Sequence, residues 1–340
     1  MGNSITTHSG KEEHNRRRTG FKRRTLKSVE SHAMIHEGIK SIKIDKNCDF
    51  SESPEVCFVI ITWNMNGKEV AYEDIEALVG DDRKFDLLVV GLQEAPGRNI
   101  SRLFEEALLQ THSLIGEAIM QSLQLYVFGP KNSELFTKGI NIDKQSIGGC
   151  GGFNGRKKGA VAISINFKGI QIVFISCHLS AHARKVETRN AEFRRISRSL
   201  FANRNPYARP CQVTVWLGDL NYRLHGIGTF PARNLIKKNL HKVLRGKDQL
   251  LQEAERGQIF NGYSEGSLRF KPTYKYDIGS SIYDTSHKER VPSWTDRILF
   301  KVEEPENISA TLHSYESIDH IDSSDHKPVK AHLCLRLNEN

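Results

Sequence analysis

Residues Val56–Gly67 read VCFVIITWNMNG, an apolar run that ends in polar residues. Its β-branched residues predict a buried strand. Similar short runs follow at Asp86–Leu92, Gly159–Ile165, Ile170–Ser176, Gln212–Leu217, Asp296–Val302 and Val329–Leu335. Segments with the period of a helix lie between them, at Glu73–Val79, Ser101–Leu109, Glu187–Ala202, Ala232–Val243 and Asp248–Arg256. Strands mixed with helices from residue 55 to residue 338 predict α/β layers packed as one domain.

The composition is that of an ordinary globular protein. Of the 340 residues, 38% are hydrophobic and 26% are charged. A chain of this kind can bury a sizeable core, which excludes disorder of the whole chain, a collagen-like fibre and a low-complexity polymer. Val56–Ile61 is the longest apolar run and is far shorter than the roughly 20 residues that span a bilayer. We therefore do not expect a transmembrane protein.

Positive charge is concentrated near the N-terminus. The formal net charge is +9, and residues 1–30 hold eight Lys and Arg against three Glu. Residues 1–50 are polar and basic, and we expect a largely flexible arm with one short element near Met34–Ile42. Such an arm suits an anionic partner, either nucleic acid or an anionic membrane leaflet. The alternative is a solvated, disordered tail.

The six cysteines are scattered and form no CxxC pair. Cys57, Cys177 and Cys211 lie in or beside apolar runs, where a free thiol packs as a small core residue. No apolar segment of a secretory signal is visible at the N-terminus. These features predict a reduced, intracellular compartment.

A glycine-rich segment, Ile147–Gly155, reads IGGCGGFNG. It has neither the GxGxxG spacing of a dinucleotide site nor the GxxxxGK[ST] pattern of a P-loop. We interpret it as a flexible hairpin or a loop at the rim of a substrate site.

Polar residues of catalytic type follow the predicted strands. One Asp, Asn or His at a strand end is usually a turn residue or a hydrogen-bonded partner. Together they are more informative, because ligands of layered α/β folds bind beyond the carboxyl ends of strands. Glu94 and Asp325 offer the hard oxygen ligands that Mg²⁺ prefers, and water is the expected attacking group. The residues are Asn64, Asn66, Gln93, Glu94, His178, Asp219, Asn221, Asp296, Asp325 and His326.

The order of these residues resembles the metal-dependent endonuclease/exonuclease/phosphatase superfamily. Two narrower segments, WLGDLNYR at Trp216–Arg223 and the stretch from PTYKYD to PSWTDRIL at Pro272–Leu299, resemble the inositol polyphosphate 5-phosphatases. The resemblance covers about residues 55–336. It implies a four-layer α/β sandwich of two packed sheets flanked by helices, and Mg²⁺-dependent hydrolysis of the 5-phosphate of an inositol ring. We expect a minimal member with a catalytic domain only.

The resemblance also implies a role for each matched residue. Glu94 would bind Mg²⁺, with Asn64 near the metal and the phosphate and Asp325 supporting the metal side. Asp219 would orient and deprotonate the attacking water, while Asn221 steadies the phosphoryl oxygens.

The remaining matched positions concern the phosphates. His178 would donate to the scissile phosphate, and His326, oriented by Asp296, would stabilise the pentavalent transition state. The positions expected to hold the ring and its neighbouring 4-phosphate are Tyr274, Lys275, Lys288 and Arg290. Cations two residues apart in an extended segment would face one side and converge on a dianion.

Some positions depart from the family pattern. Ser293 and Thr295 replace two small residues of the usual PAWCDRIL, which we expect to be harmless. Lys157 stands where an Asn is usual before Lys-Gly, so the contact of this loop with substrate stays open.

The first six residues, MGNSIT, fit the N-myristoylation pattern, with Gly2 as the acylated residue. A single myristoyl chain binds membranes only marginally, and the basic arm would supply the second signal that stable attachment requires. We therefore expect a cytoplasmic monomer that is peripheral on the cytoplasmic face of membranes, with the plasma membrane as a candidate. Its expected partners are phosphoinositide lipids and an anionic membrane surface, and no nucleic acid is expected.

Three functions compete on these observations. The first is a phosphoinositide 5-phosphatase acting on lipids such as phosphatidylinositol 4,5-bisphosphate and 3,4,5-trisphosphate, or on soluble inositol polyphosphates. The second is a nuclease of the same superfamily, since a basic arm can also bind DNA. The third is a catalytically inactive phosphoinositide-binding protein, which the complete set of catalytic positions disfavours.

Overall fold

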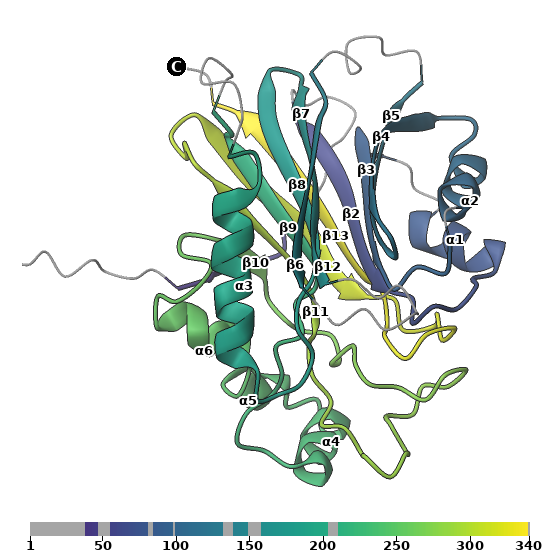
Figure 1. Ribbon diagram of the computed structural model, residues 1–340, viewed down its shortest axis with the longest axis vertical. Coiled ribbons are helices and arrows are strands. Elements are labelled where there is room, and N and C mark those ends of the chain that lie inside the picture. The colour runs from purple at the N-terminus through teal and green to yellow at the C-terminus, as the bar shows by residue number, and fades with distance from the viewer. Residues whose placement is uncertain are drawn as a thin grey trace, which may run out of the picture. The chain divides into compact units, whose positions relative to one another are not determined.

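The computed structural model describes residues 38–46, 55–80, 84–97, 99–131, 139–148, 158–202 and 210–338. They form two mixed β-sheets packed face to face, with helices on both outer faces (Figure 1). The predicted four-layer α/β sandwich is thus confirmed. Gly2, the arm up to residue 37 and most of the Ile147–Gly155 loop lie outside the described residues.

The two sheets have seven and six strands. The order of the first is β1 (Lys40–Ile42), β10 (Ser264–Gly266), β11 (Asp296–Val302), β9 (Val213–Asp219), β8 (Ile170–His178), β7 (Lys158–Phe167) and β6 (Asn141–Gly148). The order of the second is β12 (Ile308–Ser317), β13 (Val329–Leu337), β2 (Val56–Asn64), β3 (Leu87–Gln93), β5 (Leu123–Pro130) and β4 (His112–Met120).

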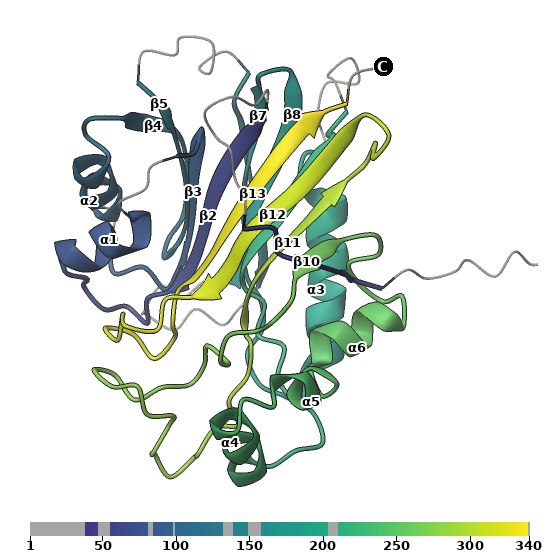
Figure 2. The same cartoon turned by 180° about the vertical axis from the view of Figure 1, so that it is seen from behind.

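Helices cover the outer face of each sheet (Figure 2). Helices α1 (Tyr72–Val79) and α2 (Ile100–Ala107) pack on the second sheet, and α3 (Val186–Ser199) and α6 (Gln249–Glu255) pack on the first. Two further helices, α4 (Thr229–Lys237) and α5 (His241–Arg245), follow β9. No helix among the described residues is long and apolar enough to cross a membrane.

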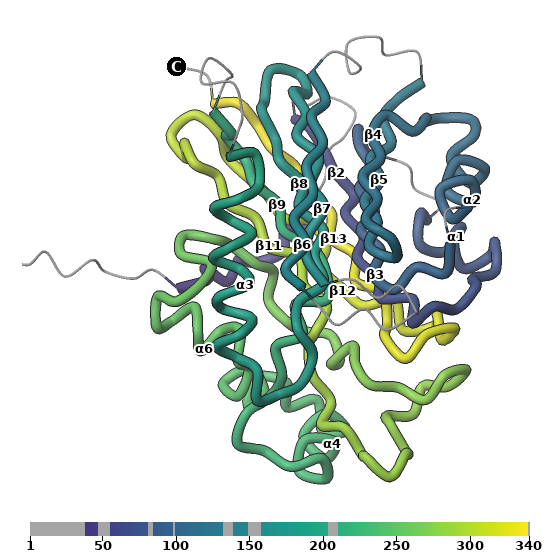
Figure 3. Tube along the Cα trace, viewed as in Figure 1, coloured from purple at the N-terminus to yellow at the C-terminus, as the bar shows by residue number. Residues whose placement is uncertain are grey.

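Strand β2 lies between β13 and β3 near the centre of the second sheet (Figure 3). All nine of its residues are buried. Phe58 and Ile60 face the core between the sheets, whereas Val59 and Ile61 face α1 and α2. Burial on both faces explains why this strand is continuously apolar instead of alternating.

The predicted helix Ala232–Val243 is divided into two. Asn239 adopts the left-handed conformation, with φ of 55°. Asn tolerates this conformation at the end of a helix better than most residues do. The chain therefore leaves α4 after Lys237 and starts α5 at His241.

Strand β1 falls inside the stretch assigned to the arm. It pairs in parallel with β10, with Lys40 opposite Ser264 and Ile42 opposite Gly266. The globular part therefore includes these residues, and β1 lies at the end of the short element expected near Met34–Ile42.

The prediction that Cys57 is a free thiol is wrong. Cys57 on β2 forms a disulfide with Cys334 on β13, which lies directly opposite in the antiparallel ladder. The partners are 277 residues apart, so only the strand register brings them together. Cys177 is a free, buried thiol as expected, and Cys211 is a half-buried thiol.

Candidate active site

Strand register gathers the predicted site residues at one end of both sheets. In the second sheet, Asn64 at the end of β2 lies opposite Gln93 at the end of the parallel strand β3. In the first sheet, His178 ends β8 opposite Asp219, which ends the parallel strand β9. Asp296 opens the antiparallel strand β11 and also lies opposite Asp219.

These strand ends surround a polar hollow of about 260 Å³. It brings together most of the strand-end residues that the sequence singles out, but neither Gln93 nor Asp296 is among its lining residues. Lys158, Ala181 and Arg223 are additional lining residues that the sequence analysis did not assign. The lining residues are Asn64, Asn66, Glu94, Lys158, His178, Ala181, Asp219, Asn221, Arg223, Tyr274, Lys275, Asp325 and His326.

Asp219 is buried and accepts a hydrogen bond from each of several neighbours. Asn64 Nδ2 and Asn221 Nδ2 each donate to Asp219 Oδ2 at 3.0 Å, and the Asn221 backbone N–H donates to Oδ1 at 3.0 Å. Burial alone would raise the pKa of Asp219, but His178, 3.1 Å from Oδ2, and the charges of His326 and Lys158 hold it far below its usual range. The carboxylate is therefore ionised at neutral pH.

The backbone around Asp219 depends on the preceding glycine. Gly218 has φ of 144°, and a Cβ at this position would lie 2.0 Å from the carbonyl oxygen of Cys177. Only glycine fits without moving β8. The glycine before Asp219 in the WLGDLNYR motif is therefore required, because β8 and β9 approach each other closely at this point.

Glu94, Asn66 and Asn221 also adopt left-handed backbone conformations, with φ of 50°, 50° and 58°. Such conformations are sparsely populated by residues other than glycine and cluster at functional sites. Here they turn the chain sharply after the buried strands, so that the side chains line the hollow.

His326 and Asp296 form a buried pair. His326 Nδ1 lies 3.0 Å from Asp296 Oδ2, and Thr273 and Thr295 donate to the same oxygen at 2.7 Å and 2.8 Å. Burial lowers the pKa of His326, but Asp296 more than compensates and raises it to about 9. The imidazole is therefore cationic at neutral pH. Its ring packs against Tyr274, with ring centroids 4.4 Å apart.

His178 and Lys158 form a second pair. Nζ of Lys158 contacts Nε2 of His178. Burial, with the nearby charge of Lys158, lowers the pKa of His178, and burial likewise lowers the pKa of Lys158. His178 is therefore neutral at pH 7. The sequence alone does not identify Lys158 as a site residue, because Arg156, Lys157 and Lys158 are three adjacent cations. The pairing of β7 with β8 places Lys158 beside His178.

The four ring-binding positions divide between two hollows. Lys275 lines the catalytic hollow, and its Nζ lies 2.6 Å from Asp325 Oδ2. Lys288 and Arg290 line a neighbouring hollow of about 320 Å³. Tyr274 and Arg223 line both, with the Arg223 guanidinium 4.1 Å from the Tyr274 ring centroid.

The expectation that Lys288 and Arg290 lie in an extended segment is wrong, because the segment forms a turn. The Glu289 N–H donates to the Ser286 carbonyl at 2.9 Å, and Glu289 has φ of 35°. Asp284 holds this turn by accepting the Arg290 N–H at 2.8 Å. Both cations nevertheless line the same hollow.

The oxygen donors at the strand ends fit a hard divalent cation. The Glu94 side chain is largely buried at the end of β3, and Oε1 lies 4.0 Å from His178 Nε2. Asn64 adds an amide oxygen from the adjacent strand end. Carboxylate and amide oxygens are the ligand types that Mg²⁺ and Ca²⁺ select. Asp325 also lines the hollow but already pairs with Lys275.

A second group of ligand-type atoms lies close by. Asp219, Asp296 and His326 each offer an atom within 4.8 Å of the others. Because Asp296 keeps His326 cationic, both imidazole nitrogens carry hydrogens and neither offers a lone pair to a metal. The His326–Asp296 pair beside Asp219 therefore fits a catalytic role better than a metal centre.

Comparison with known proteins gives a consistent result. The family model described as Endonuclease/Exonuclease/phosphatase family 2 matches residues 61–332. A type IV inositol polyphosphate 5-phosphatase from Arabidopsis thaliana is 58% identical over 93% of both chains. The human phosphatidylinositol 4,5-bisphosphate 5-phosphatase A is 32% identical over 85% of this chain, which spans 31% of the human protein.

Among solved structures, the inositol polyphosphate 5-phosphatase domain of SPsynaptojanin superposes with a TM-score of 0.70. The two chains are 27% identical, and the match covers 83% of this chain and 86% of that domain. That domain was crystallised with inositol (1,4)-bisphosphate and a calcium ion.

Proposed function

Because the chain belongs to the inositol polyphosphate 5-phosphatase family and is therefore a phosphoric monoester hydrolase, we propose that it removes the 5-phosphate of phosphoinositides. Phosphatidylinositol 4,5-bisphosphate and 3,4,5-trisphosphate are the proposed lipid substrates, and soluble inositol polyphosphates are further candidates. Mg²⁺ is the proposed cofactor. The observation that carries the proposal is the convergence of the family's positions on one polar hollow, with a cationic hollow beside it.

In the proposed reaction, water attacks phosphorus in line with the bond to the inositol oxygen. That bond breaks to give inorganic phosphate and an inositol alkoxide, which takes a proton from solvent water to become the hydroxyl, and Asp219 returns its proton to solvent. Asp219 Oδ1 accepts one hydrogen bond from the described residues, so a lone pair remains to orient the water and take up its proton. Asn64 and Asn221 hold the carboxylate in place through Oδ2.

Cationic residues around the hollow compensate the negative charge on the phosphoryl oxygens. The cationic His326, Lys158 and Arg223 lie on its wall. Preorganised donors of this kind stabilise the charge of the transition state without reorganising during the reaction. A metal bound at Glu94 and Asn64 would polarise a phosphoryl oxygen and neutralise part of this charge.

The proposal is tested by phosphate release from a panel of substrates. The panel contains inositol lipids, soluble inositol phosphates and DNA with an abasic site, each with Mg²⁺ or with EDTA. We expect release from substrates that carry a 5-phosphate, only with Mg²⁺, and no cleavage of DNA. Cleavage of DNA without phosphate release from the lipids would favour the nuclease instead.

Glu94→Gln is expected to raise the Mg²⁺ concentration that gives half-maximal activity by about tenfold or more, because it removes the anionic ligand. A Mg²⁺ titration of activity measures this shift. Glu117→Gln, at an exposed position of β4, is the matched control and should leave the titration unchanged. Full activity of the native chain in EDTA would exclude the metal mechanism.

We also propose that the part of the arm that precedes β1 attaches the enzyme to the cytoplasmic face of membranes, through acylation of Gly2 and the basic side chains of residues 1–30. Gly2→Ala is expected to move the protein from the membrane fraction to the soluble fraction of eukaryotic cells, because the remaining charges bind only weakly. Activity on a soluble inositol phosphate should not change. Mass spectrometry of the N-terminus provides the direct check, and an unmodified Gly2 or a retained Met1 would exclude the anchor.

A further inference from the structure

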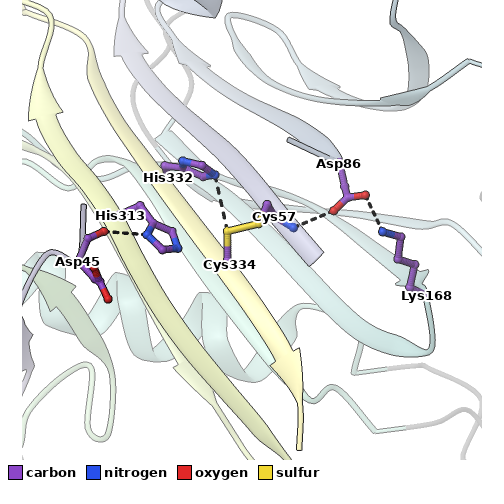
Figure 4. The surroundings of a disulfide bond; sticks show 7 residues. All are labelled: Asp45, Cys57, Asp86, Lys168, His313, His332 and Cys334. Carbon is purple, nitrogen blue, oxygen red and sulfur yellow. Dashed lines mark hydrogen bonds and ion pairs between the residues drawn. A yellow bond between two sulfur atoms is a disulfide. The ribbon is translucent and has the colours of Figure 1, made fainter. Parts of the chain in front are cut away.

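Four side chains that commonly ligate metals gather at the opposite end of β2 from the catalytic hollow. Cys57 is the second residue of β2, whereas Asn64 is its last. At about 3.3 Å per residue, the two lie about 23 Å apart along the strand. Cys334 and His332 come from β13, and His313 comes from β12 (Figure 4).

The ligand atoms form two overlapping groups that share Cys334. Atoms of Cys57, His332 and Cys334 lie within 4.8 Å of one another, as do those of Glu55, His313 and Cys334. Nε2 of His332 is 3.6 Å from Sγ of Cys334. His332 and Cys334 are two residues apart on one strand and therefore point to the same face.

His313 is oriented as a ligand would be. Its Nδ1 lies 2.7 Å from the carbonyl oxygen of Asp45, which only accepts, so Nδ1 carries the hydrogen. Nε2 then presents a lone pair, and this buried atom has no hydrogen-bond partner among the described residues. A backbone carbonyl that fixes the tautomer in this way is typical of metal-binding histidines. The His313 and His332 ring centroids are 5.3 Å apart (Figure 4).

We propose that Cys57, Cys334, His313 and His332 bind Zn²⁺ once the disulfide is reduced. Two thiolates and two imidazoles are a tetrahedral ligand set that Zn²⁺ prefers, with Zn–S distances of about 2.3 Å. In such a site the sulfurs are roughly 3.8 Å apart. Cys57 and Cys334 lie directly opposite on neighbouring strands, with Cα atoms 4.1 Å apart, so rotation of the side chains supplies this separation.

The exchange between the two states balances chemically. A dithiol reductant transfers two electrons and two protons to the disulfide, giving two cysteine thiols and the disulfide of the reductant. Zn²⁺ then displaces the two thiol protons. The disulfide and the metal site exclude each other, and either one links β2 to β13. The metal would also hold β12, through His313.

Cobalt is the probe for the full-length chain. The protein is reduced with a phosphine, which takes oxygen from water and supplies no thiolate ligand, and is then separated from the reductant without air. We expect one equivalent of Co²⁺ to give a thiolate-to-cobalt charge-transfer band that Zn²⁺ abolishes. The oxidised chain should show no such band. A metal in the catalytic hollow does not interfere, because the described lining residues there contain no sulfur.

Variants assign the ligands. Cys57→Ser should remove the band, and His313→Gln and His332→Gln should each weaken Co²⁺ binding at least tenfold. Cys211→Ser is a matched control that should keep the native band and affinity. The absence of the band in the reduced native chain, or its persistence in Cys57→Ser, would overturn the proposal. Unchanged affinity in both histidine variants would overturn the tetrahedral site. Should Cys57→Ser fail to fold, the comparison of the reduced and oxidised native chain decides.

Discussion

Replacing Asp219 with asparagine is expected to lower kcat by about 10²–10⁴-fold, the usual loss when a general base is removed. Asparagine keeps the shape and one acceptor oxygen but loses the negative charge that orients the water. KM should change much less, because the substrate phosphates are bound by the surrounding cations. Steady-state kinetics on a soluble inositol polyphosphate with saturating Mg²⁺ measures both constants.

Two measurements make this result specific. Asp319→Asn, at a half-exposed carboxylate outside the catalytic hollow, should retain native kcat. Circular dichroism and thermal unfolding of Asp219→Asn should show an intact fold, so that a lost fold is not mistaken for lost chemistry. If Asp219→Asn retained more than a third of native kcat, another group would have to activate the water.

The sequence predicts best those parts of the fold that are buried on both faces. Strands β2 and β8 are buried along their whole length and mostly apolar, because a core lies on either side of each. Strand β6, reading NIDKQSIG, gives no such signal because it is an edge strand with largely exposed side chains. Strands of this kind are defined by their hydrogen-bonded neighbour more than by their own composition.

The candidate site was predictable where a residue directly ends or opens such a strand. Asn64, His178 and Asp219 are of this kind. Lys158 and Arg223 were missed as site residues because their places depend on long-range contacts. Lys158 is placed by the pairing of Gly159 with His178, and Arg223 by stacking on a ring 51 positions further along the chain.

The long motif from PTYKYD to PSWTDRIL combines structural and catalytic positions that the sequence cannot separate. Trp294 is fully buried in the core, and Asp296 holds His326. Arg297 is also fully buried and donates to Glu265 on β10 and to Asp248 at the N-terminus of α6. A buried cation must be paired in this way, since an unpaired charge in the interior is costly. Arg297 therefore has a structural role, although it is adjacent to a predicted catalytic residue.

The division of the ring-binding cations between two hollows leads to the last prediction. Lys288→Ala with Arg290→Ala is expected to lower kcat/KM for phosphatidylinositol 4,5-bisphosphate by about 100-fold. Each charge-assisted hydrogen bond contributes about 1.5–3 kcal/mol, and the exposure of Lys288 places the pair near the lower end. Phosphatidylinositol 3,5-bisphosphate has the same number of phosphates but no 4-phosphate, so its kcat/KM should fall by much less.

Lys275→Ala provides the contrast, because Lys275 lines the catalytic hollow with Asp325 instead of the neighbouring one. Its loss should lower kcat/KM for both lipids to a similar extent. Lys237→Ala with Lys238→Ala removes the same charge from an exposed part of α4 and the residue after it, and should change neither substrate. An equal loss on the two lipids in the Lys288/Arg290 variant would mean that these cations maintain the turn at Ser286–Glu289. The 4-phosphate would then be recognised elsewhere, and Lys275 and Arg223, which both line the catalytic hollow, would be the next cations to replace.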